Sequence, residues 1–371
     1  MMTKETLIKS MCNSVEIKNF KTFNTLKVNN LNQINIIYGK NNAGKTAFLE
    51  AIYIALSNTN PTNILTALRS FPLAFSQTTK EDSLNLLFNN FEYEKQISIN
   101  LKFNNNALLK TIIEKPFLKK DIIIEADELK TRINPNSLYI KWELDFLKNN
   151  PKFVESIINF PNSPILEQTE QKSISPLSTL SIGSLNFEIK PEFYFTALGK
   201  AMSEFYINVY GNIVRKGLKE SFIKTLKSID ENVNDVDIIQ IAGVPCIGIR
   251  MGNNYFPIDT MGEGFSKIFS IIAIMIDKQN GVLLIDEIEN GIYWKVQGSF
   301  WKYLEMFAKK FNVQIFATTH SYEFLKNAIN NISEPKIVSG IKIKRKKESF
   351  EANVLKGNEL FEMLEDNYEV R

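Results

Sequence analysis

Residues 34–46, which read Ile34-Asn35-Ile36-Ile37-Tyr38-Gly39-Lys40-Asn41-Asn42-Ala43-Gly44-Lys45-Thr46, decide the fold. The last eight fit the pattern G-x-x-x-x-G-K-[ST]. The apolar run before them predicts a strand, and apolar residues at three- and four-residue spacing from Thr46 to Leu56 predict a helix. Strand, glycine-rich loop and helix in this order are typical of a phosphate-binding P-loop.

Each residue type in this loop has a physical role toward a nucleotide. Glycines let the backbone curl so that successive N–H groups face the phosphates, and the following helix directs its positive end at them. We expect Lys45 to reach the β- and γ-phosphates, as a binding and catalytic residue, and the Thr46 hydroxyl to coordinate Mg²⁺. The expected ATP-binding residues of the loop are Gly39, Lys40, Asn41, Asn42, Ala43, Gly44, Lys45 and Thr46.

A second apolar run ends in two adjacent carboxylates. The segment from Gly281 to Ile285 predicts a buried strand, and Asp286 and Glu287 follow it. An α/β sheet presents ligand-binding groups at such strand ends. An Asp-Glu pair alone is often a solvated strand end. Behind a P-loop, we expect Asp286 to hold Mg²⁺ through water and Glu287 to be the general base for the attacking water.

His320 is the one histidine of the chain. It follows another predicted buried strand, Val313 to Ala317, through Thr318-Thr319. A lone histidine is more often structural than functional. Because this one stands at a strand end behind the other two motifs, we expect it to sense the γ-phosphate and to take part in catalysis.

A glycine-rich turn, Gly262-Glu263-Gly264-Phe265-Ser266, precedes a helical run that extends to Ile276. The N-terminus of a helix binds anions, so Gly262, Glu263, Gly264 and Ser266 are expected phosphate-binding residues. Taken alone, this turn would be better interpreted as a glycine-rich helix cap without a ligand.

Composition limits the class of protein. The chain has 371 residues, of which 44% are hydrophobic, and 44 basic against 41 acidic side chains leave a formal charge of +3. These values predict a globular protein in which contact with nucleic acid would need a local basic patch. Cys12 and Cys246 are too few for a disulfide framework, and no apolar run spans a bilayer. We expect a cytoplasmic protein without membrane insertion.

The order of elements predicts an α/β fold with two parts. Residues 14–60 and 241–371 follow an α/β rhythm and form the expected ATPase head. Residues 61–240 are less regular, with strand-like pieces such as Gln96 to Phe103 and Ile122 to Ile124, and are expected to form one inserted α+β lobe. No sustained heptads occur, so no long coiled coil is expected.

Four elements in this order resemble the ATP-binding-cassette-like (ABC-type) ATPases of the SMC, RecF and OLD group, and most of all the OLD-like AAA-type ATPases of bacterial defence loci. The resemblance is carried by Ile36 to Thr46, Met261 to Gly264, Leu284 to Gly291, and Ala317 to Ser321. It implies an ABC-type P-loop NTPase head with a mixed sheet.

The resemblance also implies roles and a mode of assembly. Gly262 to Ser266 corresponds to the signature loop, Glu289 to Gly291 to the loop after Walker B, and His320 to the switch histidine. In this group two nucleotides lie between two heads, each held by the P-loop of one copy and the signature helix of the other. A homodimer or higher homo-oligomer closed through the ATP sites is the implied state.

The sequence departs from the family pattern in two places. Gly291-Ile292-Tyr293-Trp294 lacks the histidine often found after the Walker B acids, and Gly-Glu-Gly-Phe replaces the transporter form of the signature loop, which argues against a transporter ATPase. Gln77 is a weakly supported candidate for a glutamine loop. Fifty-one residues follow His320, too few for the Toprim nuclease domain of OLD proteins. Within them, residues 341–347 predict a lysine-rich strand, which either guards a sheet edge or contacts phosphates or a partner.

The leading functional hypothesis is an ATPase whose ATP-dependent dimerisation controls a separately encoded effector, in anti-phage defence. The ATP site follows from the residues, and the biological role follows from the resemblance. One alternative is a RecF-like repair ATPase that clamps DNA. Another is a nucleotide-held scaffold with little turnover, against which Glu287 argues.

Overall fold

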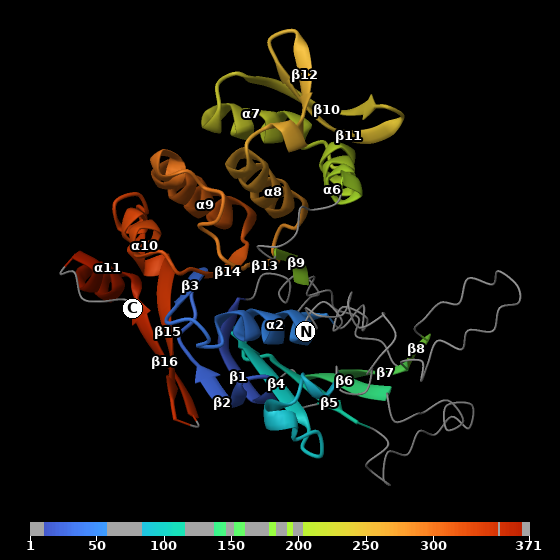
Figure 1. Ribbon diagram of the computed structural model, residues 1–371, viewed down its shortest axis with the longest axis vertical. Helices are drawn as coiled ribbons and strands as arrows, with labels where there is room; N and C mark the ends of the chain where they lie inside the picture. The colour runs from blue at the N-terminus through green and yellow to red at the C-terminus, as the bar shows by residue number, and fades with distance from the viewer. Residues whose placement is uncertain are drawn as a thin grey trace, which may run out of the picture. The chain divides into compact units, whose positions relative to one another are not determined.

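The computed structural model divides into two compact units (Figure 1). Unit 1 consists of Met1–Leu31, Asn41–Ile189 and Ile343–Asn353, and unit 2 of Asn32–Lys40, Lys190–Lys342 and Val354–Arg371. The structure describes residues 11–57, 84–115, 137–145, 152–159, 178–182, 191–195, 203–347 and 349–365.

A six-stranded sheet has the strand order β16-β15-β3-β14-β13-β9; it belongs to unit 2 except for residues 343–353 of β15 and β16, which are assigned to unit 1. Its strands β3, β13 and β14 are short, mainly apolar and buried along their whole length, as expected where both faces of a parallel sheet are covered. The pairs β15–β3, β3–β14, β14–β13 and β13–β9 are all parallel. The bounds are β3 Ile34–Tyr38, β9 Pro191–Phe195, β13 Val282–Ile285, β14 Gln314–Thr318, β15 Val338–Lys346 and β16 Ser349–Lys356.

The register of this sheet aligns the carboxyl ends of its central strands. Thr318 pairs with Ile37, and Ile285 pairs with Ala317, so β3, β14 and β13 end at the same edge. The three strands lie side by side in Figure 1. Whatever follows each strand in the sequence is therefore brought together at this edge.

Helices complete the core of unit 2. Helix α8, Glu263–Asp277, packs against α6, α7 and α9, and α9 also contacts α10. Phe269 of α8 meets Phe222 of α7 edge-on, with ring centroids 5.1 Å apart. The other helices are α6 Ser203–Arg215, α7 Lys219–Ile229, α9 Gln297–Phe311, α10 Tyr322–Ile329 and α11 Gly357–Glu365, with short 3₁₀ turns at Ile258–Thr260, Trp294–Val296 and Pro335–Ile337.

A second, three-stranded antiparallel sheet belongs to unit 2. It has the order β10-β11-β12, with bounds Val233–Ile241, Val244–Met251 and Asn254–Pro257. Helix α7 packs on β10 and α6 on β11, and the Tyr210 hydroxyl of α6 donates to the Val236 carbonyl at 2.5 Å. These contacts join the sheet to the helical layer that contains α8.

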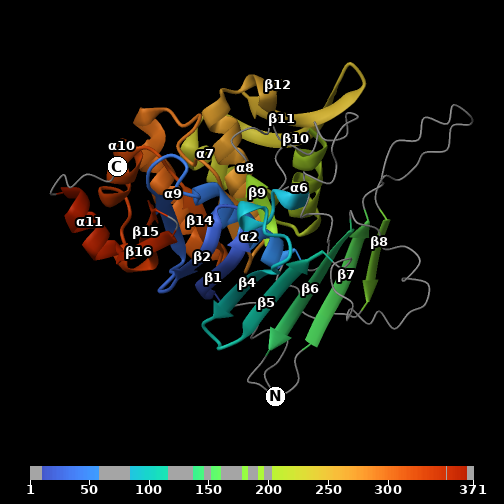
Figure 2. The same cartoon turned by 60° about the horizontal axis from the view of Figure 1, so that its bottom comes forward.

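Unit 1 is built on a seven-stranded antiparallel sheet with the order β2-β1-β4-β5-β6-β7-β8. Strands β4 to β8 lie side by side in Figure 2. Buried and part-exposed residues alternate along β4 and β6, the pattern of a sheet with one covered face. The bounds are β1 Cys12–Phe20, β2 Phe23–Val28, β4 Ile97–Phe103, β5 Leu108–Glu114, β6 Ser137–Asp145, β7 Lys152–Asn159 and β8 Ser178–Ile182.

Helix α2, Lys45–Leu56, covers part of that sheet. It packs against β1, β4 and β5, and the Trp142 indole of β6 donates to the Ile54 carbonyl at 3.1 Å. A buried ion pair adds to the contact, because the Lys21 ammonium lies 2.6 Å from the Glu50 carboxylate, whose side chain is 3% exposed. The P-loop helix is thus held by both apolar and polar contacts.

Several predicted elements are confirmed. The strands at 34–38 and 96–103 are β3 and β4, the helix after the P-loop is α2, and the run to Ile276 is α8. The longest helices in the described ranges, α8 and α9, have 15 residues each, so no long coiled coil occurs there. The fold is mixed α/β, as predicted. The expected strand at 122–124 and the candidate Gln77 lie outside the described residues.

Other expectations need correction. The sequence from Ile292 to Lys310 predicts one helix, but the helix, α9, begins at Gln297, because Gly291 has a φ of 75° and a 3₁₀ turn follows at Trp294–Val296. The lysine-rich strand is β15, which lies between β3 and β16 and is not the sheet edge. Beyond Lys342, its residue Lys346 pairs with Glu351 of β16 at 2.6 Å.

The two units follow other boundaries than the predicted head, 14–60 and 241–371, and lobe, 61–240. Strands β1 and β2 join β4 to β8 in one sheet, and residues 190–240 belong to unit 2. A division into a nucleotide-binding head and a lobe with another role stays a prediction. In the described ranges, no helix is both long enough and apolar enough to cross a membrane.

The anchoring of α2 by Trp142 can be tested by Trp142→Phe. This change removes a buried indole N–H donor and part of a buried ring, so we expect the free energy of unfolding to fall by about 1 to 3 kcal/mol in urea titrations. Trp294→Phe is the matched control, because Trp294 is 65% exposed and the same change there should have little effect. Equal losses in the two variants would contradict the proposed anchor.

Candidate functional site

The site lies at the edge where β3, β13 and β14 end. Gly39 follows β3, Asp286 and Glu287 follow β13, and Thr319 and His320 follow β14. The Thr319 N–H donates to the Ile37 carbonyl at 3.0 Å, which extends the β3–β14 pairing to the start of the loop. The parallel register thus brings three of the sequence motifs to one place.

Thr318 connects the two acidic residues to β14. Its hydroxyl donates to Asp286 Oδ1 at 2.6 Å and accepts the Glu287 N–H at 2.8 Å. Thr318 is fully buried and Asp286 is 4% exposed, so these hydrogen bonds are shielded from water. Sequence reasoning missed this residue, which it treated only as a link between a strand and His320. The sequence did contain one signal for Thr318: it is a hydroxyl residue directly after a predicted buried strand, the same position that the acidic pair has after its own strand.

Glu287 has a left-handed backbone with a φ of 51°. This conformation is unfavourable for a residue with a Cβ, at a cost of about 1 to 2 kcal/mol. Its N–H is held by Thr318, and its carboxylate Oε2 accepts from Asn290 Nδ2 at 2.7 Å. Strain held in place by fixed neighbours is typical of functional positions.

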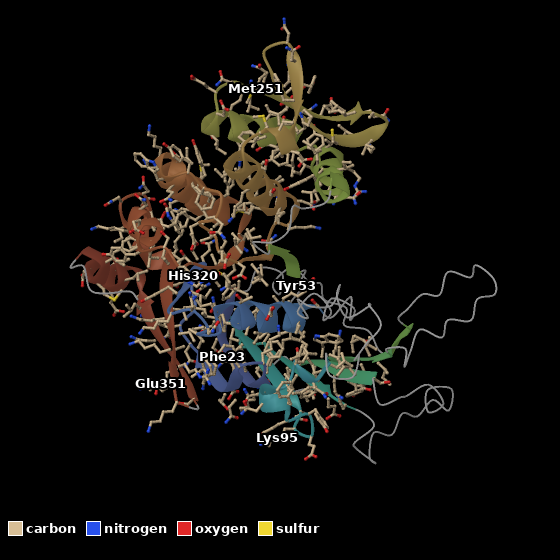
Figure 3. All side chains as sticks on the ribbon, viewed as in Figure 1. Phe23, Tyr53, Lys95, Met251, His320 and Glu351 are labelled. Atoms are coloured by element: carbon tan, nitrogen blue, oxygen red, sulfur yellow. The ribbon has the colours of Figure 1, made fainter. Side chains whose placement is uncertain are left out.

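His320 is exposed, and its backbone N–H donates to Glu289 Oε1 at 2.7 Å. Figure 3 labels His320. The other oxygen, Glu289 Oε2, is buried and has no hydrogen-bond partner among the described residues. It is an acceptor that a bound water, including one on a magnesium ion, could satisfy. Glu289 thus links the loop after β13 to the loop after β14.

The P-loop has the backbone that its glycines predict. Positive φ angles occur at Gly39, Asn42 and Gly44, and α2 begins at Lys45, which is 5% exposed. A Cβ at Gly44 would lie 2.6 Å from the Phe23 ring, so glycine is required there for space as well as for conformation. Phe23, labelled in Figure 3, is itself packed against Phe350, with ring centroids 5.0 Å apart.

The chain passes from unit 2 to unit 1 within this loop. Gly39 and Lys40 belong to unit 2 with Asp286, Glu287 and His320, whereas Asn41 to Thr46 belong to unit 1. Burial raises the pKa of Tyr38, the residue before the loop, to about 12.

The start of α8 is the remaining predicted part of the site. Gly262 is the N-cap and is exposed, and a Cβ there would meet no atom within 4 Å. Glu263 lies in the first turn. A Cβ at Gly264, in contrast, would lie 2.5 Å from the Gly291 carbonyl oxygen of the same chain. Gly264 is therefore needed for packing against the loop after β13, a reason that the sequence did not show.

Ser266 has an intrachain role at the same helix. Its hydroxyl donates to the Ile258 carbonyl at 2.9 Å, which ties the second turn of α8 to the preceding 3₁₀ turn. To donate to a phosphate it would have to leave this acceptor. The phosphate-binding role of Ser266 stays a prediction.

Comparison with known proteins identifies the family. The model of the AAA ATPase domain family matches residues 11–175 and 154–325, and the chain belongs to this family. It is thus a P-loop NTPase-type protein.

Individual relatives and solved structures have low sequence identity to this chain. The chain is 25% identical over 342 residues to an ATP/GTP phosphatase of Helicobacter pylori, covering 85% of this chain and 87% of that protein. It is 28% identical over 176 residues to an uncharacterized protein of Methanocaldococcus jannaschii, covering 47% and 75%. The SMC head domain from Thermotoga maritima aligns with 12% identity and a TM-score of 0.42 over 93% of this chain and 99% of that chain. The family assignment depends on the sequence match.

The role of Thr318 can be tested by Thr318→Val, which keeps the shape and removes the hydroxyl. Because a buried carboxylate then loses a donor and a buried N–H loses an acceptor, we expect the free energy of unfolding to fall by about 1 to 3 kcal/mol. Thr318→Ser keeps the hydroxyl and should lose only the methyl contribution, about 0.8 kcal/mol. A valine variant at least as stable as the serine variant in urea titrations would rule out this role.

Proposed function

We propose that the protein is an Mg²⁺-dependent ATPase that uses the edge of the β3–β14–β13 sheet as its reaction centre. The observation that supports this most is the register that places Gly39, the Asp286-Glu287 pair and His320 after three neighbouring parallel strands. The name of the Helicobacter relative, ATP/GTP phosphatase, agrees with this chemistry.

The proposed roles follow from the chemistry of each group. Backbone N–H groups of residues 39–46 and the Lys45 ammonium bind the phosphates, and Thr46 and Asp286 hold Mg²⁺. The metal, when bound, neutralises charge on the β- and γ-phosphates. Among the described residues no cluster of three or more His, Cys, Asp or Glu side chains could hold a metal alone, so the phosphates themselves would complete this site.

Glu287 accepts a proton from the attacking water in this mechanism, and His320 donates to the γ-phosphate. The first role agrees with the surroundings of Glu287. Its main chain is held by Thr318, and its carboxylate accepts from Asn290 through one oxygen, Oε2. A general base needs such a fixed position and an accessible lone pair.

We also propose that ATP closes a homodimer. The N-terminus of α8 has an exposed glycine cap, and helix N-termini favour anions. A phosphate held by the P-loop of a second copy suits it, in a two-fold interface. Control of a separately encoded effector in anti-phage defence is the biological role proposed for this cycle, and its support is the family resemblance of the motifs.

The catalytic proposal is tested by Glu287→Gln, which keeps the size of the side chain and removes the base. We expect ATP binding to persist and turnover to fall about a hundredfold or more, the range of general base catalysis. Calorimetry with a non-hydrolysable ATP analogue measures binding, and the rate of phosphate release measures turnover. Glu362→Gln, at an exposed position of α11, is the control that should keep full turnover. Hydrolysis at the wild-type rate in Glu287→Gln would remove this residue from the mechanism.

The shared site is tested by mixing two inactive variants. Lys45→Ala removes the phosphate-binding ammonium. Gly262→Asp places a negative charge at the α8 N-terminus, and the open space there and the preference of N-caps for aspartate should preserve folding. An equal mixture forms mixed dimers with one intact site, so about a quarter of the wild-type activity should return.

Two controls accompany the mixing test. Sedimentation must show that mixed dimers form, and each variant alone must be inactive. If dimers form and no activity returns at any ratio, each chain hydrolyses ATP by itself and the proposal of a shared site fails.

A further inference from the structure

Lys267 connects the start of α8 to the loop that carries Glu287. Its ammonium lies 2.9 Å from the Glu287 carbonyl oxygen and 2.9 Å from the Asn290 carbonyl oxygen. Hydrogen bonds from an ammonium group are stronger than those from neutral donors. One side chain thus holds both ends of the segment from Glu287 to Asn290.

A second contact joins the same two segments one turn earlier. Gly264 approaches the Gly291 carbonyl so closely that a Cβ would lie 2.5 Å from the oxygen. The first two turns of α8 therefore rest on the 287–291 loop at two points, Gly264 and Lys267. These two contacts fix the loop relative to the start of the helix.

The backbone of Glu287 depends on this support. Its φ of 51° is unfavourable, and both of its peptide groups are held: the N–H by Thr318 from β14, and the carbonyl by Lys267 from α8 and by the Asn290 N–H at 3.1 Å. The direction of the Glu287 side chain follows from this backbone. Loss of the ammonium would release one of the contacts that hold it.

We infer that Lys267 is a positioning residue for Glu287, and that it couples the position of the start of α8 to the placement of the catalytic carboxylate. This inference rests on the proposed ATPase function. It gives helix α8 a role in positioning Glu287, in addition to the proposed phosphate binding at its N-terminus. Hydrolysis would then depend on the position of α8 through Lys267, which acts on the loop main chain at Glu287 and Asn290.

Lys267→Met tests the inference, because it keeps the length of the side chain and removes the charge. We expect kcat to fall on the order of tenfold to a hundredfold, the scale of a misplaced catalytic group, with KM and affinity for the ATP analogue within about twofold of wild type. Lys267→Arg retains a cation with several donors and should recover part of kcat. Lys302→Met, at an exposed position of α9, is the matched control and should keep kcat.

The decisive measurement is a double-mutant cycle with Glu287→Gln. If Lys267 acts through Glu287, Lys267→Met should cause no further loss of the residual hydrolysis in the Glu287→Gln background. Thermal melting confirms that the variants are folded. The loop is partly exposed, so water can replace the ammonium at the two carbonyls and the melting temperature should change little.

The outcomes separate this inference from the proposed function. Wild-type protein without ATP hydrolysis, or an active Glu287→Gln variant, would refute the proposed ATPase mechanism. A normal kcat in Lys267→Met, or an equal fractional loss in both backgrounds, would refute the role of Lys267 and leave the ATPase proposal standing.

Discussion

The parallel pairing of β3 with β14, and of β14 with β13, is the constraint on which the rest of the site depends. Main-chain hydrogen bonds set this register, and the bond from the Thr319 N–H to the Ile37 carbonyl continues it past the end of β14. Because side chains alternate and strands advance by a fixed rise per residue, a slip of one residue would turn every site residue to the other face.

At the strand ends the structure uses neutral and charge-assisted hydrogen bonds to place its carboxylates. Asp286 is nearly inaccessible to water, and a carboxylate in such a place is unfavourable unless donors satisfy it. Thr318 is one of these donors, and it holds the Glu287 N–H with the same hydroxyl oxygen. The two acids, adjacent in the sequence, therefore have different surroundings: the first is fixed and buried, and the second is more exposed on a strained backbone.

Helix α8 belongs to the core and to the site at once. Its apolar residues, Phe269 and Ile272 among them, are buried in unit 2, while its first turns contact the loop after β13 through Gly264 and Lys267. The stability of the helix thus supports the geometry of Glu287. This arrangement explains why a glycine stands inside the first turn of a helix: the close approach to Gly291 outweighs the usual cost of about 1 kcal/mol for glycine in a helix.

The sequence by itself determined the elements whose signals are local. The P-loop, its strand and helix, β13 with its acidic pair and the start of α8 could be predicted, because periodicity and glycine positions depend on near neighbours. Thr318, Lys267, the contact between Gly264 and Gly291, and the division into units could not. Each depends on which distant segments pair, and therefore only the tertiary structure decided them.

The helix expected from Ile292 was placed too early for a related reason: the positive φ of Gly291 and the contact of its carbonyl with α8 extend the loop. Local physics specifies strands and helices, whereas the positions of their side chains in a site are specified by the long-range register of the sheet.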